Sequence, residues 1–260
     1  MTFINKYPKR YRDYSSFIKE TFNQRTQKIS VDAGFTCPNR DGTKGKGGCS
    51  YCNNKTFSPY YTTAKKSIEK QLNEGIEFFA KKYKSQKYLA YFQSYTNTYA
   101  DVSDLEKLYK QALKLPSVIG LIISTRPDCI TDEVIYLLQK ISKNYFLIVE
   151  LGVESTLDRS LKRVNRCHTY NDSVNAINEL HKAGIKVGAH LILGLPGENR
   201  QDLINHAKKI SELPLTTLKL HQLQIIKGTK IQKDLEQYKD DFLVLTADEY
   251  IEIVVEFLEY

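Results

Sequence analysis

Short runs of apolar and β-branched residues alternate with segments of helical apolar spacing along most of this chain. The extended runs are residues 28–33, 88–93, 118–123, 146–151, 185–193 and 216–223. The helical segments span about 64–82, 101–114, 131–143, 170–183 and 199–212. Strands that alternate with helices pair in parallel through right-handed crossovers. The pattern therefore predicts an α/β fold, either an open doubly wound sheet or an incomplete (β/α) barrel, with ligands at the carboxyl ends of the strands.

Composition and charge narrow the class of protein. The 260 residues are 41% hydrophobic and 26% charged, which is typical of a globular protein large enough for a substantial core. The sequence has no apolar run of about 18 residues and no apolar segment near Met1. We therefore predict a cytoplasmic protein with no membrane partner. The net charge is +8, and residues 231–260 carry nine acidic residues against two lysines. A basic body of this kind favours a polyanionic partner such as nucleic acid, although lysine-rich surfaces are also common without one.

Three of the five cysteines, Cys37, Cys49 and Cys52, lie within a glycine-rich segment just after the first extended run. Their spacing is C-x11-C-x2-C. A structural zinc site usually has four protein ligands, so Cys167 or His168 would have to complete it. A nucleophilic cysteine would leave two thiols idle. An iron–sulfur cluster held by three thiolates keeps one iron open for another ligand, and the count of three favours this interpretation while leaving the others possible.

The residues around these cysteines carry a family resemblance. Residues 32–42 read DAGFTCPNRDG and residues 47–52 read GGCSYC. This signature resembles the radical S-adenosylmethionine (SAM) superfamily, whose common spacing is C-x3-C-x2-C. The longer first gap is similar to a subgroup close to the catalytic subunit of Elongator, and most similar to a bacterial subfamily of that group. The resemblance extends from about residue 8 to residue 260.

The resemblance implies an incomplete (β/α)6 barrel of parallel strands with the cluster loop after the first strand. It implies a 4Fe–4S cluster on Cys37, Cys49 and Cys52, with SAM on the open iron. The expected organisation is a basic amino-terminal arm over residues 1–27, the partial barrel over 28–230, and an acidic segment with a helix over 231–260. The apolar stripe of that helix is Ile251, Val254, Val255 and Leu258. The helical pattern reaches Tyr260 without a cap, so we expect it to pack along the open side of the barrel, or to fray, in a chain that continues further.

Polar and glycine residues after each strand are the candidate SAM contacts that the resemblance implies. The candidates are Tyr51, Gln93, Ser94, Thr96, Asn97, Ser124, Glu154, Arg166, Ile192 and Gly194. Glu154 is expected at the ribose, Arg166 at the SAM carboxylate, and Ile192 with Gly194 at the adenine. Alternation along the fourth strand also directs Glu150, Gly152 and Glu154 to one side. Cys129 and His221 are weaker candidates for a catalytic role.

The same resemblance implies the activity. Members cleave SAM reductively to a 5′-deoxyadenosyl radical, and Elongator-like relatives modify the wobble uridine of tRNA. A tRNA substrate and an external electron donor such as flavodoxin or ferredoxin are the expected partners. The basic arm interleaves the aromatic residues Tyr7, Tyr11, Tyr14, Phe17 and Phe22, which suits RNA, and it leads directly to the cluster strand. The alternatives are a radical SAM enzyme that acts on a small metabolite or a protein side chain, or a non-catalytic zinc-stabilised RNA-binding module.

Overall fold

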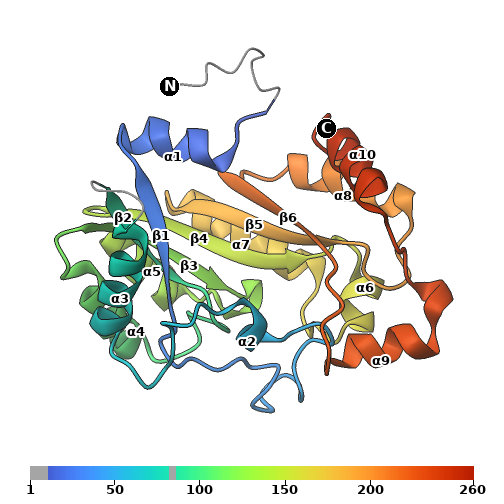
Figure 1. Ribbon diagram of the computed structural model, residues 1–260, viewed down its shortest axis with the longest axis horizontal. Helices are drawn as coiled ribbons and strands as arrows, with labels where there is room; N and C mark the ends of the chain where they lie inside the picture. The colour runs from blue at the N-terminus through green and yellow to red at the C-terminus, as the bar shows by residue number, and fades with distance from the viewer. Residues whose placement is uncertain (1–10, 82–85) are drawn as a thin grey trace.

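A single parallel sheet of six strands, in the order β1-β2-β3-β4-β5-β6, forms the centre of the computed structural model, which describes residues 11–81 and 86–260. The strands are β1 Thr26–Val31, β2 Lys87–Phe92, β3 Val118–Thr125, β4 Phe146–Glu154, β5 Lys186–Leu193 and β6 Thr217–Gln222. The sheet curls into a half-barrel (Figure 1). Because each strand pairs with its sequence neighbour, the strand order never reverses as it does in a doubly wound sheet. The barrel alternative is therefore the correct one.

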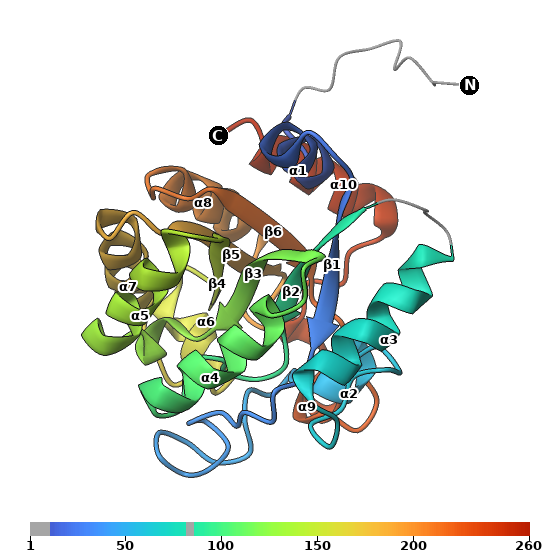
Figure 2. The same cartoon turned by 90° about the vertical axis from the view of Figure 1, so that its left-hand side faces the viewer.

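Helices cover the outer face of this sheet, as Figure 2 shows for α3, α4, α5, α7 and α8. The helices are α1 Tyr14–Phe22, α2 Asn54–Phe57, α3 Ile68–Ala80, α4 Val102–Leu113, α5 Asp132–Ser142, α6 Asp158–Arg163, α7 Tyr170–Lys182, α8 Arg200–Ser211, α9 Lys230–Gln237 and α10 Ala247–Phe257. Short 3-10 turns lie at Pro127–Cys129 and Lys239–Asp241. None of the helices in the described residues is long and apolar enough to cross a bilayer.

Caps define several of the helix ends that the sequence predicts. The Thr131 side chain accepts a hydrogen bond from the Val134 amide at the start of α5. Gly184 lies just beyond α7 with φ of +76°, a conformation that residues with a Cβ seldom adopt. Asp101 occupies the N-cap position of α4, but its side chain makes no capping hydrogen bond. The end of a helix limits where the following strand can begin. The first residue of a strand in turn sets which of its alternating side chains face the barrel interior.

The interior of the half-barrel is closed at the amino ends of its strands by α1. Phe17 and Ile18 of α1 are buried in a cluster with the inward side chains Leu89, Ile122 and Ile148. This corrects the expectation for the amino-terminal arm, because Phe17 belongs to the core and is not free to stack on bases. Figure 1 also shows α1 at the end of β1 opposite to the loop that leads to α2, so its amphipathic face closes the barrel away from the cysteines.

Other aromatic residues of the arm have different surroundings. Phe22 packs edge-on against Phe146 with ring centroids 4.8 Å apart. Tyr11 and Tyr14 are partly exposed, at 55% and 37%. Tyr7 lies outside the described residues, as do Lys9 and Arg10.

The carboxy-terminal helix α10 packs on α8 and adds Ile253 and Phe257 to the main core. The predicted stripe is correct only in part. Val254 packs against the main core, but Ile251, Val255 and Leu258 are exposed, while Ile253 is 1% exposed. The helix also ends at Phe257, where the Leu258 amide donates back to the last turn, so the helical pattern does not continue to Tyr260. Two faces of α10 carry apolar residues at similar helical spacing. Only the packing of the helix against α8 decides which of these faces is buried.

Candidate functional site

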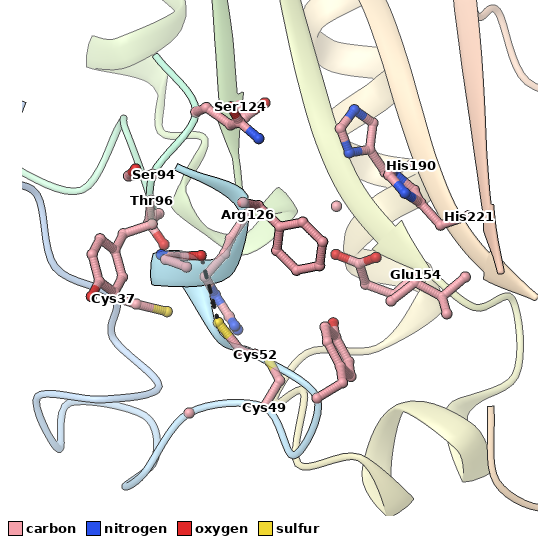
Figure 3. Close-up of a pocket in the computed structure, with 18 of the residues that line it drawn as sticks. Cys37, Cys49, Cys52, Ser94, Thr96, Ser124, Arg126, Glu154, His190 and His221 are labelled. Atoms are coloured by element: carbon pink, nitrogen blue, oxygen red, sulfur yellow. Dashed lines mark hydrogen bonds between the residues drawn. The ribbon is translucent and has the colours of Figure 1, made fainter. Parts of the chain in front are cut away.

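A cavity of about 320 Å³ opens at the carboxyl ends of β2 to β6, and we call it the front pocket. Its wall combines the cysteine loop with side chains from five strand ends, including Gln93, Ser124, Glu154, Ile192 and His221. Figure 3 shows Cys49 and Cys52 below this space and Cys37 to its left, facing Glu154, His190 and His221 across it. The pocket therefore lies where parallel α/β folds bind their ligands.

The loop that carries the three cysteines is built from tight turns. The Arg40 amide donates to the Cys37 carbonyl at 2.7 Å, and the Cys52 amide donates to the Cys49 carbonyl at 3.0 Å. Gly48 has φ of +82°, and a Cβ there would lie 2.9 Å from Nε of Arg40. The Ser50 amide then donates to the Val164 carbonyl at 3.0 Å. These bonds hold the three thiols on one wall of the front pocket.

Cationic and amide groups surround the thiols. Arg166 Nη1 lies 3.6 Å from Cys49 Sγ, and Asn39 Nδ2 lies 3.6 Å from the same sulfur. Burial raises the pKa of Cys52, while the Arg40 guanidinium acts against that rise. Arginine next to a thiol favours the thiolate, which is the form that binds metal. The described residues contain no group of three His, Cys, Asp or Glu that could hold one metal ion. Thiols that bind separate irons of a cluster need not converge on one point.

Glu154 and Arg166 form the second feature of the pocket. Their closest atoms, Oε1 and Nη2, are 3.4 Å apart, and Arg166 Nη2 also donates to the Gly152 carbonyl at 2.7 Å. A Cβ at Gly152 would lie 2.4 Å from Glu154 Oε1, so the pair requires glycine there. Glu154 itself has φ of +67°. A residue held in this strained conformation by its surroundings is typical of functional sites.

Arg126 and Asp128 form a buried pair at the end of β3. Nε and Nη2 of Arg126 each lie 2.9 Å from a carboxylate oxygen of Asp128, and Lys44 Nζ lies 2.7 Å from the same carboxylate. Burial would raise the pKa of Asp128, but the hydrogen bonds from Arg126 outweigh it and lower the pKa to about 2. The pair anchors the cysteine loop through Lys44 and leaves Arg126 facing the pocket.

Glu150 lies on β4, deeper in the barrel than Glu154. Its carboxylate connects β4 to residues of β1, β3 and β5. Its carboxylate accepts from Lys28 Nζ at 2.7 Å and from Ser124 Oγ at 3.3 Å, and it lies 3.0 Å from His190 Nε2. Burial would raise the pKa of Glu150, but His190 and the Lys28 charge hold it well below the usual range. The rings of His190 and His221 are 5.3 Å apart, and burial together with Lys219 lowers the pKa of His221 to about 4. His221 is therefore neutral at pH 7.

Most of the residues that the sequence predicts at the site line the front pocket. They are Cys37, Cys49, Tyr51, Cys52, Gln93, Ser94, Thr96, Ser124, Glu154, Arg166, Ile192 and His221. The individual roles of these residues in SAM binding and catalysis stay predictions.

Three predicted residues are not among those that line the front pocket. Asn97 Nδ2 donates to the carbonyls of Phe92 and Ser124, at 3.1 and 2.8 Å, so its side chain secures a loop. Cys129 is buried, which raises the pKa of its thiol to about 12. Gly194 has φ of +86° and shapes the turn after β5 through its backbone. Cys167 and His168 likewise do not line the pocket.

Sequence reasoning missed Arg40 and His190 as lining residues of the front pocket. His190 alternates with Gly188 and Ile192 along β5, so the period of two could have assigned it to the inner face. Arg40 lies in the cysteine loop, where no period exists. Its position depends on the fold of the loop.

Several buried polar atoms around the front pocket have no hydrogen-bond partner in the described structure. They are Tyr51 Oη, Thr96 Oγ1, Arg126 Nη1 and Arg166 Nε. Buried polar groups without partners are costly and mark the place of a polar ligand. Donors of this kind suit the carboxylate and hydroxyl groups of SAM, and the three thiols suit iron. The residues present therefore fit a cluster with a bound SAM molecule.

Comparison with known proteins agrees with this chemistry. Residues 37–210 match the Radical SAM superfamily, which covers more than half of the chain, so this chain belongs to that superfamily. The match confirms the predicted class of enzyme, its partial barrel and its two cofactors, SAM and a 4Fe–4S cluster.

Three relatives place the chain more closely. The uncharacterized protein YtqA of Bacillus subtilis is 36% identical over 251 residues, which are 96% of this chain and 77% of that protein. A tRNA uridine(34) acetyltransferase of Methanocaldococcus infernus is 30% identical over 140 residues, 52% of this chain and 25% of that enzyme. The structure of archaeal Elp3 from the same organism, with its amino terminus deleted, superposes with a TM-score of 0.68 at 20% identity. That superposition covers 90% of this chain and about half, 54%, of the Elp3 chain. The Elongator-like relation is therefore confirmed.

Proposed function

We propose that this protein cleaves SAM reductively at its cluster and acts on the side chain of a wobble uridine in tRNA. The observation that carries the radical chemistry is the C-x11-C-x2-C motif, whose three thiols line one wall of a pocket that also contains unpartnered polar groups. The tRNA substrate is supported by the likeness to tRNA uridine(34) acetyltransferases. We expect the reaction to take place in the cytoplasm.

The residues of the front pocket have separate tasks in this proposal. Cys37, Cys49 and Cys52 would hold the cluster, and Arg166 with Glu154 would bind the polar groups of SAM. When bound, this cofactor pair supplies a 5′-deoxyadenosyl radical that removes hydrogen from an unreactive carbon. The barrel wall excludes water and orients the substrate carbon.

The electron that starts the reaction must come from outside the chain. We include in the proposal a one-electron donor of the flavodoxin or ferredoxin class. Anaerobic protein with dithionite and SAM should release 5′-deoxyadenosine, which tests cofactor chemistry without any knowledge of the substrate.

The substrate is tested by nucleoside analysis of bulk tRNA from a deletion strain. We expect loss of a 5-substituted uridine and accumulation of its carboxymethylaminomethyl-type precursor. A plasmid that carries the wild-type gene should restore the profile, and so should the matched variant Cys167→Ser. The Cys49→Ala variant should not restore it.

An unchanged tRNA profile would refute the wobble-uridine proposal. If SAM cleavage persists in that case, the substrate is a small metabolite or a protein side chain. If the reconstituted protein instead binds one zinc ion and no iron, the chain is the zinc-stabilised binding module.

A further inference from the structure

A second cavity, of about 660 Å³, lies behind the front pocket, and we call it the rear pocket. It is bounded by α1 and by the amino-terminal halves of β1 and β6, the two edge strands of the half-barrel. Figure 2 shows α1 lying across the gap between these two strands. The rear pocket thus opens on the side of the barrel away from the cysteine loop.

The two pockets share a wall. Tyr91, Glu150, His190 and Lys219 line both of them. The hydrogen bonds from Lys28 and His190 to Glu150 fix this wall in the middle of the barrel. A ligand in the rear pocket would therefore lie directly behind the residues that face the cofactors.

The rear pocket carries an excess of positive charge. Its lining contains the four cationic side chains Lys19, Arg25, Lys28 and Lys219, and Glu150 is its single carboxylate. Lys28 is paired with Glu150, whereas Lys19 and Lys219 make no ion pair within residues 11–81 and 86–260. Burial lowers the pKa of Lys219, and the nearby Lys28 charge adds to this while Glu150 opposes it.

The lining of the rear pocket also includes a residue with an unpartnered hydroxyl. Thr26 lines the rear pocket, and its Oγ1 is a buried atom without a hydrogen-bond partner. Ammonium groups with a neutral hydroxyl donor form the set that recognises an oxyanion.

We propose that the rear pocket is an oxyanion-binding site in which Lys219 and Lys28 bind a phosphate or carboxylate group. An anion there would compensate the charge of Lys219 and add a second partner to Lys28. Because the wall is shared, such a ligand would be held beside Glu150 and His190. This site shares the wall that contains Lys219 with the front pocket, and it does not depend on a tRNA substrate.

Thermal unfolding of the reconstituted holoenzyme tests the proposal. Inorganic phosphate and acetate are titrated separately against chloride at constant ionic strength, because the two arms distinguish a phosphate from a carboxylate ligand. An anion concentration of about ten times Kd should raise Tm by roughly 3 °C for a domain of this size. The Lys219→Gln variant should lose at least half of that shift. The control variant Lys186→Gln, at the first residue of β5 and not among the residues that line the rear pocket, should keep it. The absence of any anion-specific shift in the wild-type protein would overturn the proposal.

A covalent probe provides a second measurement that does not depend on unfolding. Pyridoxal 5′-phosphate, an anionic aldehyde, is added and reduced with borohydride, and labelled lysines are identified by mass spectrometry. We expect Lys219 to label several-fold faster than Lys186, and inorganic phosphate to protect it. Labelling of Lys219 at the rate of Lys186, or without protection by phosphate, would contradict an anion site even if the Gln variant fails to fold.

Discussion

The two ends of the half-barrel differ in how their interiors are filled. At the amino ends of the strands, Phe17 and Ile18 pack on inward apolar side chains in a buried cluster that lies beside the rear pocket. At the carboxyl ends, the interior holds thiols, arginines and carboxylates around an open cavity. The first arrangement contributes hydrophobic stabilisation, and the second leaves buried polar atoms without partners. The comparison indicates that apolar packing by α1 is concentrated at one end of the strands and the cofactor site at the other.

Backbone strain follows the same division. Tyr95, Glu154 and Cys167 all have positive φ, and all lie at or beyond the carboxyl ends of their strands. Asn23, just after α1, is the exception at the other end, and it ends a helix in the left-handed conformation. Strain of about 1–3 kcal/mol per residue persists where the surroundings fix the conformation. Stability elsewhere in the fold must offset this strain.

The largest effect is expected at the cysteines. Replacing any one of Cys37, Cys49 and Cys52 by alanine removes a cluster ligand, so we expect complete loss of SAM cleavage and of the brown colour after anaerobic reconstitution. None of the three thiols forms a disulfide, so the apoprotein of each variant should still fold. Iron content and 5′-deoxyadenosine release are the measurements.

The remaining cysteines provide the controls for that experiment. Cys129→Ala and Cys167→Ala should retain both the cluster and SAM cleavage, because neither residue lines the front pocket. Loss of iron in Cys167→Ala would make Cys167 a fourth ligand and leave no open iron for SAM.

A smaller effect, on stability and not on SAM cleavage, is expected at α1. Phe17 is 7% exposed, and Phe17→Ala should lower the free energy of unfolding by about 3 kcal/mol. SAM cleavage per folded molecule should stay within twofold of the wild type. Urea unfolding measures the first quantity, and Tyr136→Ala, at a side chain that is 73% exposed, is the matched control. Unchanged stability in Phe17→Ala would show that α1 does not close the barrel in solution.

The sequence predicts the closed end and the frame better than the pocket. All six strands lie within a few residues of the predicted runs. The central strands such as β2 and β3 are the most apolar, because a strand covered on both faces needs a continuous apolar segment. Helices α2, α6 and α9 were not predicted, because their four, six and eight residues are too short to show a clear helical period. The role of α1 also escaped prediction, since an amphipathic basic segment fits both an exposed arm and a barrel closure.

Contacts between distant residues explain most of what the sequence could not show at the site. Alternation along β4 correctly put Glu150 and Glu154 on the inner face, but the Lys28–Glu150 pair joins residues 122 positions apart. Asn97 and Cys129 follow strand ends just as the lining residues do, yet they turn towards the loop and the core. Only the fold of each loop decides which polar side chain reaches the cavity.

The smallest effect is expected at Asp128, which tests whether the division between the two ends is strict. This residue lies at the carboxyl end of β3, yet its buried pair with Arg126 should stabilise the fold. The folded pKa of Asp128 is about 2, below the value near 3.9 of an unfolded chain, so its contribution is present above about pH 4 and is lost as the pH falls towards 2. Asp128→Asn should therefore lower the free energy of unfolding by about 2 kcal/mol at pH 7.

Urea unfolding between pH 7 and pH 2.5 measures this contribution. The gap between Asp128→Asn and the wild-type protein should narrow steadily below pH 4, because the wild-type carboxylate then takes up a proton. Asp104→Asn, at an exposed pair with Lys107 on α4, should show no comparable gap at any pH. A gap that stays constant with pH would mean that Asp128 acts through packing alone. A gap that narrows would show that the cofactor end also contributes electrostatic stability, through the Arg126 that faces the front pocket.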